Sequence, residues 1–311
     1  MNLSQNRTAV EFRLSVAFLA LVGAVPVAVS NPYWLGVMIV SMYFALLAIG
    51  WNLLAGYTGQ FSMAPACFAM IGAYATGLLS HHWNVSPWIG LPASILAAGA
   101  IGMALGRIVM RLRGPYLALT TLSFAEIMRV VISNSYEFTR GDLGLNVPSI
   151  FDQRLAYYYL FLALLASAQF GLYLLLRSKA GLYLQAIRDD ELAAASRGVN
   201  IVFWKTAAFT LSTALSGLAG ALYGNFSQLI SPELGLITQT GLVISMVVIG
   251  GIGSLIGPLL GAFLVYVSSE MLRETGGIQL IVFSLLVIVF ARFYREGLWG
   301  LTKHMFARKA A

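Results

Sequence analysis

Two side chains of opposite charge stand inside an apolar run of this 311-residue chain. Glu126 and Arg129 are three positions apart, so a helix would place both on one face. If that run crosses a membrane, each charge alone at its centre would cost roughly 2.5–3.5 kcal/mol. We therefore expect the two side chains either to line or gate a pathway, or to form a structural ion pair.

Residues that could support enzymatic chemistry are scarce. His81, His82 and His304 all fall in predicted loops, and Cys67 stands alone within an apolar run. This pattern disfavours catalytic, cofactor and metal sites, and a solvated pair is a simpler interpretation of His81 and His82 than a metal site. The chain also lacks the Gly-Lys pair of a Walker A motif. We expect a protein that is not an enzyme and does not itself hydrolyse ATP.

The composition is that of a membrane protein. Hydrophobic residues make up 59% of the chain and charged residues 10%, with a mean hydropathy of +0.81. Soluble domains have about 45–50% apolar and about 25% charged residues. A net charge of +7 could suggest nucleic acid, but the basic residues lie mostly between apolar runs. We predict an all-α polytopic integral membrane protein that contacts lipid and no nucleic acid.

The apolar runs predict about ten transmembrane helices, each spanning about 20 residues. They lie at residues 15–30, 34–55, 61–79, 88–110, 115–134, 155–176, 205–229, 237–250, 256–272 and 278–294. The eighth and ninth runs are separated by a helix break at Gly250, Gly251 and Gly253, since glycines let a membrane helix break inside a protein. One span followed by a re-entrant loop is the alternative for 237–272.

The distribution of basic residues predicts the orientation. With the N-terminus in the cytoplasm, 15 of the 19 lysines and arginines fall on the cytoplasmic side. Both termini are then cytoplasmic, and 1–311 forms a single transmembrane permease domain. Its cytoplasmic parts are 1–14, the loop 177–204 and a basic tail at 295–311. A signal peptide cleaved near Ser30 fits this count less well than an uncleaved first span.

The loop 177–204 carries its own helical signal. Residues Leu182–Ser196 predict a short helix with a partly apolar stripe, and Gly198 follows as a C-cap. Such a helix can insert into a groove of a partner protein. It can also lie on the membrane surface, and the spacing does not separate these two possibilities.

This loop also carries a family resemblance. Residues 188–200, RDDELAAASRGVN, resemble the coupling segment of ABC-importer permeases, and more closely that of branched-chain amino-acid permeases of the LivM type. Further segments agree with this family in order, at 50–62 with 72–74, 113–122, 205–220 with 230–232, and 250–254 with 257–258. The chain departs from the family pattern at 63–66 and at Arg140-Gly141.

The resemblance implies a type II ABC importer permease-like bundle that forms half of a channel in the bacterial cytoplasmic (inner) membrane. The implied partners are a second permease of the LivH type, two ABC ATPases that bind ATP and Mg, and an extracytoplasmic solute-binding protein. The implied cargo is leucine, isoleucine or valine. The motif assigns ATPase coupling to Arg188, Glu191, Ala194 and Gly198.

The translocation path is less well marked. Polar residues within a bundle usually face a cavity or a partner, which favours Asn52, Ser62, Thr121, Glu126 and Arg129. For Asn52 and Thr121, hydrogen bonding between helices explains the polarity equally well. Urea, short amides, other amino acids and aromatic acids are alternative cargoes within the family. An ion-coupled secondary transporter with Glu126 at its centre and a purely structural subunit are alternative classes.

Overall fold

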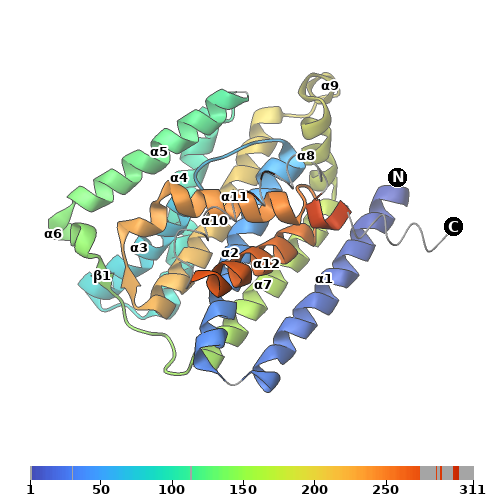
Figure 1. The fold of residues 1–311 in the computed structure, drawn as a ribbon. Helices are drawn as coiled ribbons and strands as arrows, with labels where there is room; N and C mark the ends of the chain where they lie inside the picture. Colours follow the sequence, from blue (N-terminus) through green and yellow to red (C-terminus); the bar gives the residue numbers. More distant parts are fainter. Residues whose placement is uncertain are drawn as a thin grey trace. The chain divides into compact units, whose positions relative to one another are not determined.

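The computed structural model describes residues 2–29, 31–112 and 114–273, together with 285, 288 and 297–300. This part of the chain is almost entirely helical (Figure 1). The long helices are α1 (Asn2–Ala28), α2 (Pro32–Thr58), α3 (Pro65–Trp83), α4 (Pro87–Val109), α5 (Pro115–Asn134), α7 (Arg154–Arg177) and α10 (Ile201–Ser227). The shorter elements are α6 (Tyr136–Thr139), η1 (Gly141–Leu143), β1 (Leu145–Asn146), α8 (Lys179–Asp189), α9 (Glu191–Ser196), β2 (Leu229–Ile230), η2 (Pro232–Gly235), α11 (Ile237–Gly250) and α12 (Gly257–Met271).

Nine of the ten predicted runs coincide with helices in the described residues. Six of these helices, α1, α2, α4, α5, α7 and α10, are long and apolar enough to cross a membrane. At 14 and 15 residues, α11 and α12 are shorter than the roughly 20 residues that a full span needs. The tenth run, 278–294, lies outside the described ranges apart from two isolated residues. The fold is thus polytopic and helical, and the count of ten spans stays a prediction.

Proline sets the start of several helices. Pro32, Pro65, Pro87 and Pro115 are the first residues of α2, α3, α4 and α5. Proline is favoured there because its fixed φ suits a helix, and its missing N–H would have had no partner within the helix. The third helix therefore begins at Pro65 and not at residue 61, where the apolar run begins.

The chain divides into two compact units built from interleaved segments. Unit 1 comprises Met1–Asn52, Gln153–Arg177 and Val243–Ala311, and unit 2 comprises Leu53–Asp152 and Ser178–Leu242. Because the segments alternate along the sequence, neither unit is one continuous stretch. The expectation of a single permease domain over 1–311 stays a prediction.

Unit 2 is built on a close three-helix packing of α3, α4 and α10. Glycines make this packing possible, because a Cβ on Gly220 would collide with the backbone of Ala69. A Cβ on Gly72 would likewise meet the backbone of Gly217, and one on Gly102 would meet the side chain of Thr213. Small residues let membrane helices approach this closely, so these three helices form a tightly packed block.

A short β-ribbon closes one end of unit 2. Strands β1 and β2 pair antiparallel, with Leu145 opposite Ile230. The chain reaches β1 through a turn in which Arg140 has φ 59° and Gly141 has φ 55°. A non-glycine residue with a left-handed φ is uncommon, and here it stands at one of the two places where the chain departs from the pattern of the family that it resembles.

In unit 1, α1 packs along α7, and the Tyr158 hydroxyl donates to the carbonyl of Val22 at 2.5 Å. Helices α11 and α12 approach each other through glycines. A Cβ on Gly261 would collide with the carbonyl of Met246, and one on Gly250 would collide with that of Gly257. The segment 251–256 between these helices is non-helical, and Gly251 and Gly253 have left-handed φ values of 121° and 74°.

Candidate coupling and translocation sites

The predicted coupling segment forms two helices joined at a corner residue, Asp190. The prediction of one helix over Leu182–Ser196 is wrong, because α8 ends at Asp189 and α9 begins at Glu191. Asp190 is extended, with φ −158° and ψ 109°, and its carboxylate accepts from the backbone N–H groups of Leu192 and Ala193 at 2.9 and 3.1 Å. Asp190 is therefore the N-cap of a new helix, a role for which aspartate is among the preferred residues.

Gly198 ends α9. Its φ of 82° is left-handed, and its N–H donates to the carbonyl of Ala195 at 2.9 Å. The N–H of Val199 donates to the carbonyl of Ala194 at 3.2 Å. This pair of bonds is the Schellman arrangement, in which glycine supplies the left-handed residue. The sequence therefore located the end of the segment but missed the corner in its middle.

Arg188 ties α8 to the end of α2. Its Nη1 donates to the carbonyl of Gly56 at 2.9 Å, and its guanidinium also pairs with Asp189 at 3.0 Å. Nearby, the ring of Tyr183 lies 5.2 Å from that of Trp204 on α10. Helix α8 thus contacts the rest of unit 2 through the Arg188–Gly56 hydrogen bond at one end and through aromatic packing beside α10.

The most buried ion pair of the segment joins Glu191 to Lys205. The two side chains form an ion pair between the first residue of α9 and the first turns of α10. The Lys205 side chain is only 1% exposed, and that of Glu191 is 24% exposed. Breaking a buried pair by removing one partner is strongly destabilising. The sequence reasoning selected Glu191 but not Lys205, although a lone lysine at the start of an apolar run was a usable signal.

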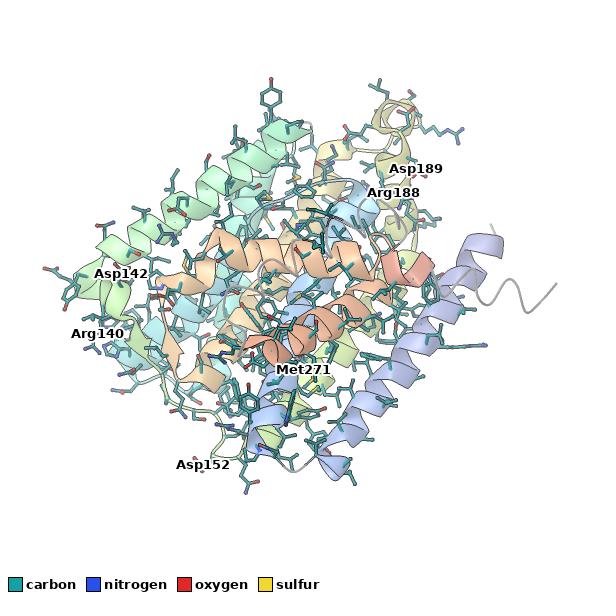
Figure 2. The ribbon with its side chains drawn as sticks, in the orientation of Figure 1. Arg140, Asp142, Asp152, Arg188, Asp189 and Met271 are labelled. Carbon is teal, nitrogen blue, oxygen red and sulfur yellow. The ribbon has the colours of Figure 1, made fainter. Side chains whose placement is uncertain are left out.

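The remaining surface of α9 is exposed and mainly apolar. Leu192 is 67% exposed, and Ala193 and Ala195 are exposed beside it. Ala194, by contrast, is 4% exposed and packs inside unit 2. A bulky residue at Ala194 would overpack this chain itself, so a substitution there would not be a clean probe of a partner contact. Figure 2 shows Arg188 and Asp189 at the end of unit 2 opposite Arg140 and Asp142.

Asn52 holds the glycine break. Its amide nitrogen donates to the carbonyl of Ser254 at 2.9 Å, and its amide oxygen accepts from the N–H of Gly253 at 2.8 Å. The residue is fully buried. Asn52 thus joins α2 to the non-helical segment 251–256 and not to another helix, and both polar atoms of its side chain are engaged with backbone groups.

Two further buried side chains hold the same break. Glu11, only 2% exposed, accepts from the N–H of Leu255 at 2.7 Å. Gln169 donates to the carbonyl of Leu255 at 2.7 Å and to the Ser15 hydroxyl at 3.0 Å. Sequence reasoning missed Glu11 because it began the first span at residue 15, whereas α1 begins at Asn2. A carboxylate at a helical position just before an apolar run was the available signal.

Ser62 and Thr121 are brought together at the start of α3. The Thr121 hydroxyl accepts from the N–H of Met63 at 2.9 Å, and the Ser62 hydroxyl accepts from the N–H of Ala64 at 3.3 Å. Both side chains are buried. They fix the chain as it enters α3. A cavity of about 650 Å³, lined by Phe61, Met63 and the first turns of α5, lies beside them.

Glu126 and Arg129 form the predicted pair on α5. Arg129 Nη2 lies 2.5 Å from Glu126 Oε1, and its Nε donates to both carboxylate oxygens. The Glu126 side chain is 52% exposed and that of Arg129 is 25% exposed. The pair therefore lies on a face of α5 that the described residues leave uncovered, not within a packed core.

The prediction of a loop at the histidine pair is wrong, because His81 and His82 lie in the last turn of α3. The His82 ring stacks on Phe138 at 5.1 Å, and its Nε2 lies 3.0 Å from the Phe138 carbonyl. Across the described ranges, no cluster of three or more histidine, cysteine, aspartate or glutamate side chains could hold a metal ion.

Comparisons with known proteins place the chain in a family. A family model for "Branched-chain amino acid transport system / permease component" matches residues 33–291. The chain is 31% identical to the high-affinity branched-chain amino acid transport system permease protein LivM of Escherichia coli (strain K12), over 93% of this chain and 75% of that protein. It is 30% identical to LivM of Salmonella typhimurium, over 92% and 75%, and 26% identical to LivH of that organism, over 82% and 90%. No solved structure gives a significant match.

These findings confirm the LivM-type resemblance on which the sequence analysis rested. The family model covers both the glycine break and the α8–α9 corner. Its members are transport subunits, so the interpretation of this chain as a transport subunit without a catalytic site is also confirmed. The chain belongs to the family of branched-chain amino acid transport permeases.

Proposed function

We propose that this chain is the LivM-type permease subunit of an ATP-driven ABC importer for leucine, isoleucine and valine. It would act in a bacterial cytoplasmic membrane with both termini in the cytoplasm. Its partners would be a LivH-type permease, two ABC ATPases and an extracytoplasmic solute-binding protein. The cargo is inferred from the relatives' names, since a fold alone does not identify a substrate.

The observation that carries the proposal is the construction of the α8–α9 corner. Its outer face, around Leu192 and Ala193, is exposed and apolar, which suits insertion into a groove of a partner. Its inner face is anchored by the Glu191–Lys205 ion pair to α10. A partner ATPase that grips the outer face would therefore act directly on α10.

Movement of α10 would extend to the rest of unit 2. Close glycine contacts join α10 to α3 at Gly217 and Gly220 and to α4 at Gly102, so these helices have little freedom to slide separately. We infer that closure of the ATPase pair pushes on α9 and displaces this block as a rigid body. Such a displacement would open the translocation path alternately to the two sides of the membrane.

The uncovered face of α5 is the best candidate for the translocation path. It carries the Glu126–Arg129 pair and the exposed side chains of Tyr116 and Leu119. An ion pair on such a face supports contact with a water-filled path or with the second permease, since lipid would solvate it poorly. Ser62 and Thr121 would shape the path through the adjacent loop, and Asn52 would act by holding the glycine break.

Substituting Ala193→Trp in the complete importer tests the coupling role. Ala193 is exposed, so the larger side chain should leave the folding of this chain unchanged while blocking the partner groove. We expect ATP-driven uptake of radiolabelled leucine to fall at least about tenfold, a change of about 1.4 kcal/mol. Ala104→Trp, at an alanine on α4 that is also exposed, is the control and should transport normally. Normal uptake by the Ala193→Trp importer would reject the coupling assignment.

The same uptake assay separates the remaining alternatives. Competition by isoleucine and valine, but not by urea, acetamide or benzoate, would assign the cargo within the family. Uptake that survives ATP depletion but stops with an uncoupler would replace the ABC mechanism with an ion-coupled one centred on Glu126. Loss of uptake in Glu126→Gln with assembly intact would argue against a purely structural subunit.

A further inference from the structure

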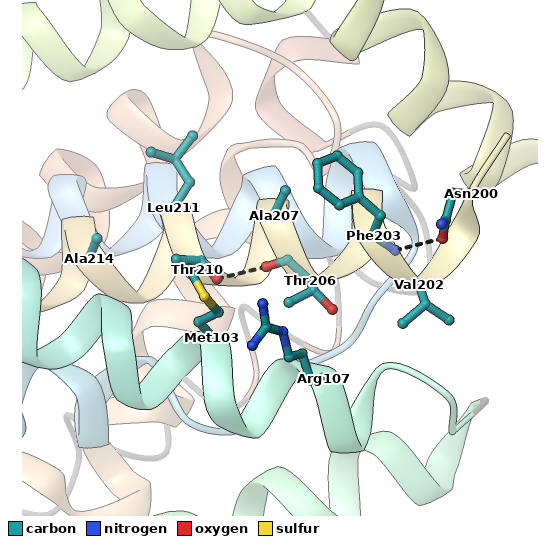
Figure 3. A pocket seen from close by; sticks show the side chains of 10 residues that line it. All are labelled: Met103, Arg107, Asn200, Val202, Phe203, Thr206, Ala207, Thr210, Leu211 and Ala214. Carbon is teal, nitrogen blue, oxygen red and sulfur yellow. Dashed lines mark hydrogen bonds between the residues drawn. The ribbon is translucent and has the colours of Figure 1, made fainter.

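A cavity of about 580 Å³ lies between α4 and α10 in unit 2, apart from the candidate path on α5. Most of its wall is apolar and comes from Met103 on α4 and from Phe203 and Leu211 on α10 (Figure 3). All three side chains are exposed to the surroundings of the described chain. In a membrane this hollow would open towards lipid.

One part of the cavity is cationic. Arg107, in the last turn of α4, lines it, and its exposed side chain makes no hydrogen bond or ion pair within the described part of the chain. The N-terminus of the 27-residue helix α10 begins beside it, at the N-cap Asn200. A helix N-terminus carries partial positive charge, so it adds to the potential of the guanidinium.

A buried hydroxyl points to a missing partner at the same place. Thr206 lines the cavity, is 8% exposed, and its Oγ1 has no hydrogen-bond partner within the described residues. Figure 3 shows its side chain directed towards the side of the cavity on which Arg107 lies. Buried polar groups are normally hydrogen-bonded, so the orphan Thr206 hydroxyl indicates an acceptor that the described residues do not supply. The exposed guanidinium of Arg107 would attract an acceptor that is anionic.

We propose that this cavity binds one anionic phospholipid. The phosphate would sit against Arg107 near Thr206 and the start of α10, and an acyl chain would follow Phe203, Met103 and Leu211. An occupant needs both an anionic end and an apolar chain to satisfy both parts of the wall. Phospholipid combines these features, and basic pockets between membrane helices are known to hold lipid headgroups.

Native mass spectrometry of the full chain, purified in mild detergent and titrated with phosphatidylglycerol, tests the proposal. We expect one lipid to bind tightly, and Arg107→Gln to weaken this binding about tenfold because a charge-assisted hydrogen bond is lost. Arg111→Gln is the matched control, since this exposed arginine lies four positions later and does not line the cavity. Equal lipid binding by wild type and Arg107→Gln would overturn the proposal.

A second variant tests the apolar part and does not depend on Arg107. Ala207→Trp should fill the cavity and prevent lipid binding, whereas Ala104→Trp on the outer face of α4 should not.

Phosphatidylethanolamine with the same chains should bind more weakly than phosphatidylglycerol. Inorganic phosphate that displaces the lipid at similar concentrations would reassign the cavity to a free anion. Cross-linking of Ala207→Cys to the second permease would reassign it to a protein contact. Either result would overturn the proposal.

Discussion

The glycine break at 251–256 and the α8–α9 corner at Asp190 both interrupt helical structure, but they are held in opposite ways. The break lies among the buried polar side chains of Asn52, Gln169 and Glu11, which bond directly to its backbone. The corner caps itself with Asp190 and is attached by the Glu191–Lys205 ion pair on one side and by the Arg188–Gly56 hydrogen bond on the other, while its outer face is exposed.

This difference indicates how each bend can take part in transport. A break held by several buried hydrogen bonds has one favoured geometry, because moving it would leave polar groups unpaired. A corner held at two points can move as a unit while α9 keeps its own caps. The break is therefore suited to a fixed frame, and the corner to receiving a push. In the proposed transport role, unit 1 therefore contains the fixed bend and unit 2 the movable one.

The largest expected effect is at the corner's attachment. Glu191→Ala would leave the Lys205 ammonium buried without its partner and should lower the free energy of unfolding by about 3–5 kcal/mol. Chemical unfolding in detergent, followed by circular dichroism, measures this change. Asp189→Ala removes an exposed pair with Arg188 and should cost less than about 1 kcal/mol. The double variant Glu191→Ala, Lys205→Met should recover most of the loss, and failure to do so would mean the pair is not the attachment.

The next effect concerns space at the glycine break. Gly250→Ala would force a Cβ into the carbonyl of Gly257, and backbone cannot turn aside as a side chain can. We expect a loss of about 2–3 kcal/mol in the same unfolding measurement. Gly241→Ala, on the same helix, meets nothing within 4 Å and should be neutral or slightly stabilising. Equal stability of the two variants would show that α11 and α12 do not depend on this close approach.

Much of the fold could be predicted from hydropathy, because an apolar run and a proline at its start are local signals. The positions of α2, α4 and α5 follow from both signals within a few residues, and that of α7 follows from its apolar run alone. What could not be predicted is the set of tertiary contacts between the helices. The bounds of α11 and α12 also follow closely from the runs 237–250 and 256–272, but nothing in these runs shows that a Cβ on Gly261 would collide with the carbonyl of Met246.

The candidate site shows the same division. The Schellman end at Gly198 was visible in the sequence, because glycine after a helical segment is a local signal. The corner at Asp190 was not, because aspartate is also tolerated inside a helix and the deciding cap bonds appear only in three dimensions. Likewise, the roles of Lys205 and Glu11 depend on contacts with Glu191 and Leu255, which lie 14 and 244 residues away in the sequence.

A third prediction tests the clamp on the break. Glu11→Leu removes the acceptor of the Leu255 N–H and should cost about 1–3 kcal/mol, since that buried donor would be left unpaired. Glu11→Gln keeps one acceptor oxygen and should recover part of the loss. Thermal unfolding of the purified variants measures both. If Glu11→Leu were as stable as wild type, the break would be held by glycine packing alone, and the contrast with the corner would weaken.

The smallest effect is at Gly198, where the corner uses glycine for conformation and not for space. A Cβ there would meet nothing within 4 Å, but its φ of 82° is left-handed. Gly198→Ala should therefore cost only about 1 kcal/mol, the usual penalty for a side chain in that region, and Gly198→Asn should cost less because asparagine tolerates it better. Thermal unfolding of the two variants measures this difference. If crowding, and not backbone conformation, sets the need for glycine at the break, Gly250→Ala should lower the free energy of unfolding more than Gly198→Ala does. The reverse order would mean that the corner is the more tightly constrained of the two bends, and the α9 end would then be too rigid to act as the proposed moving part.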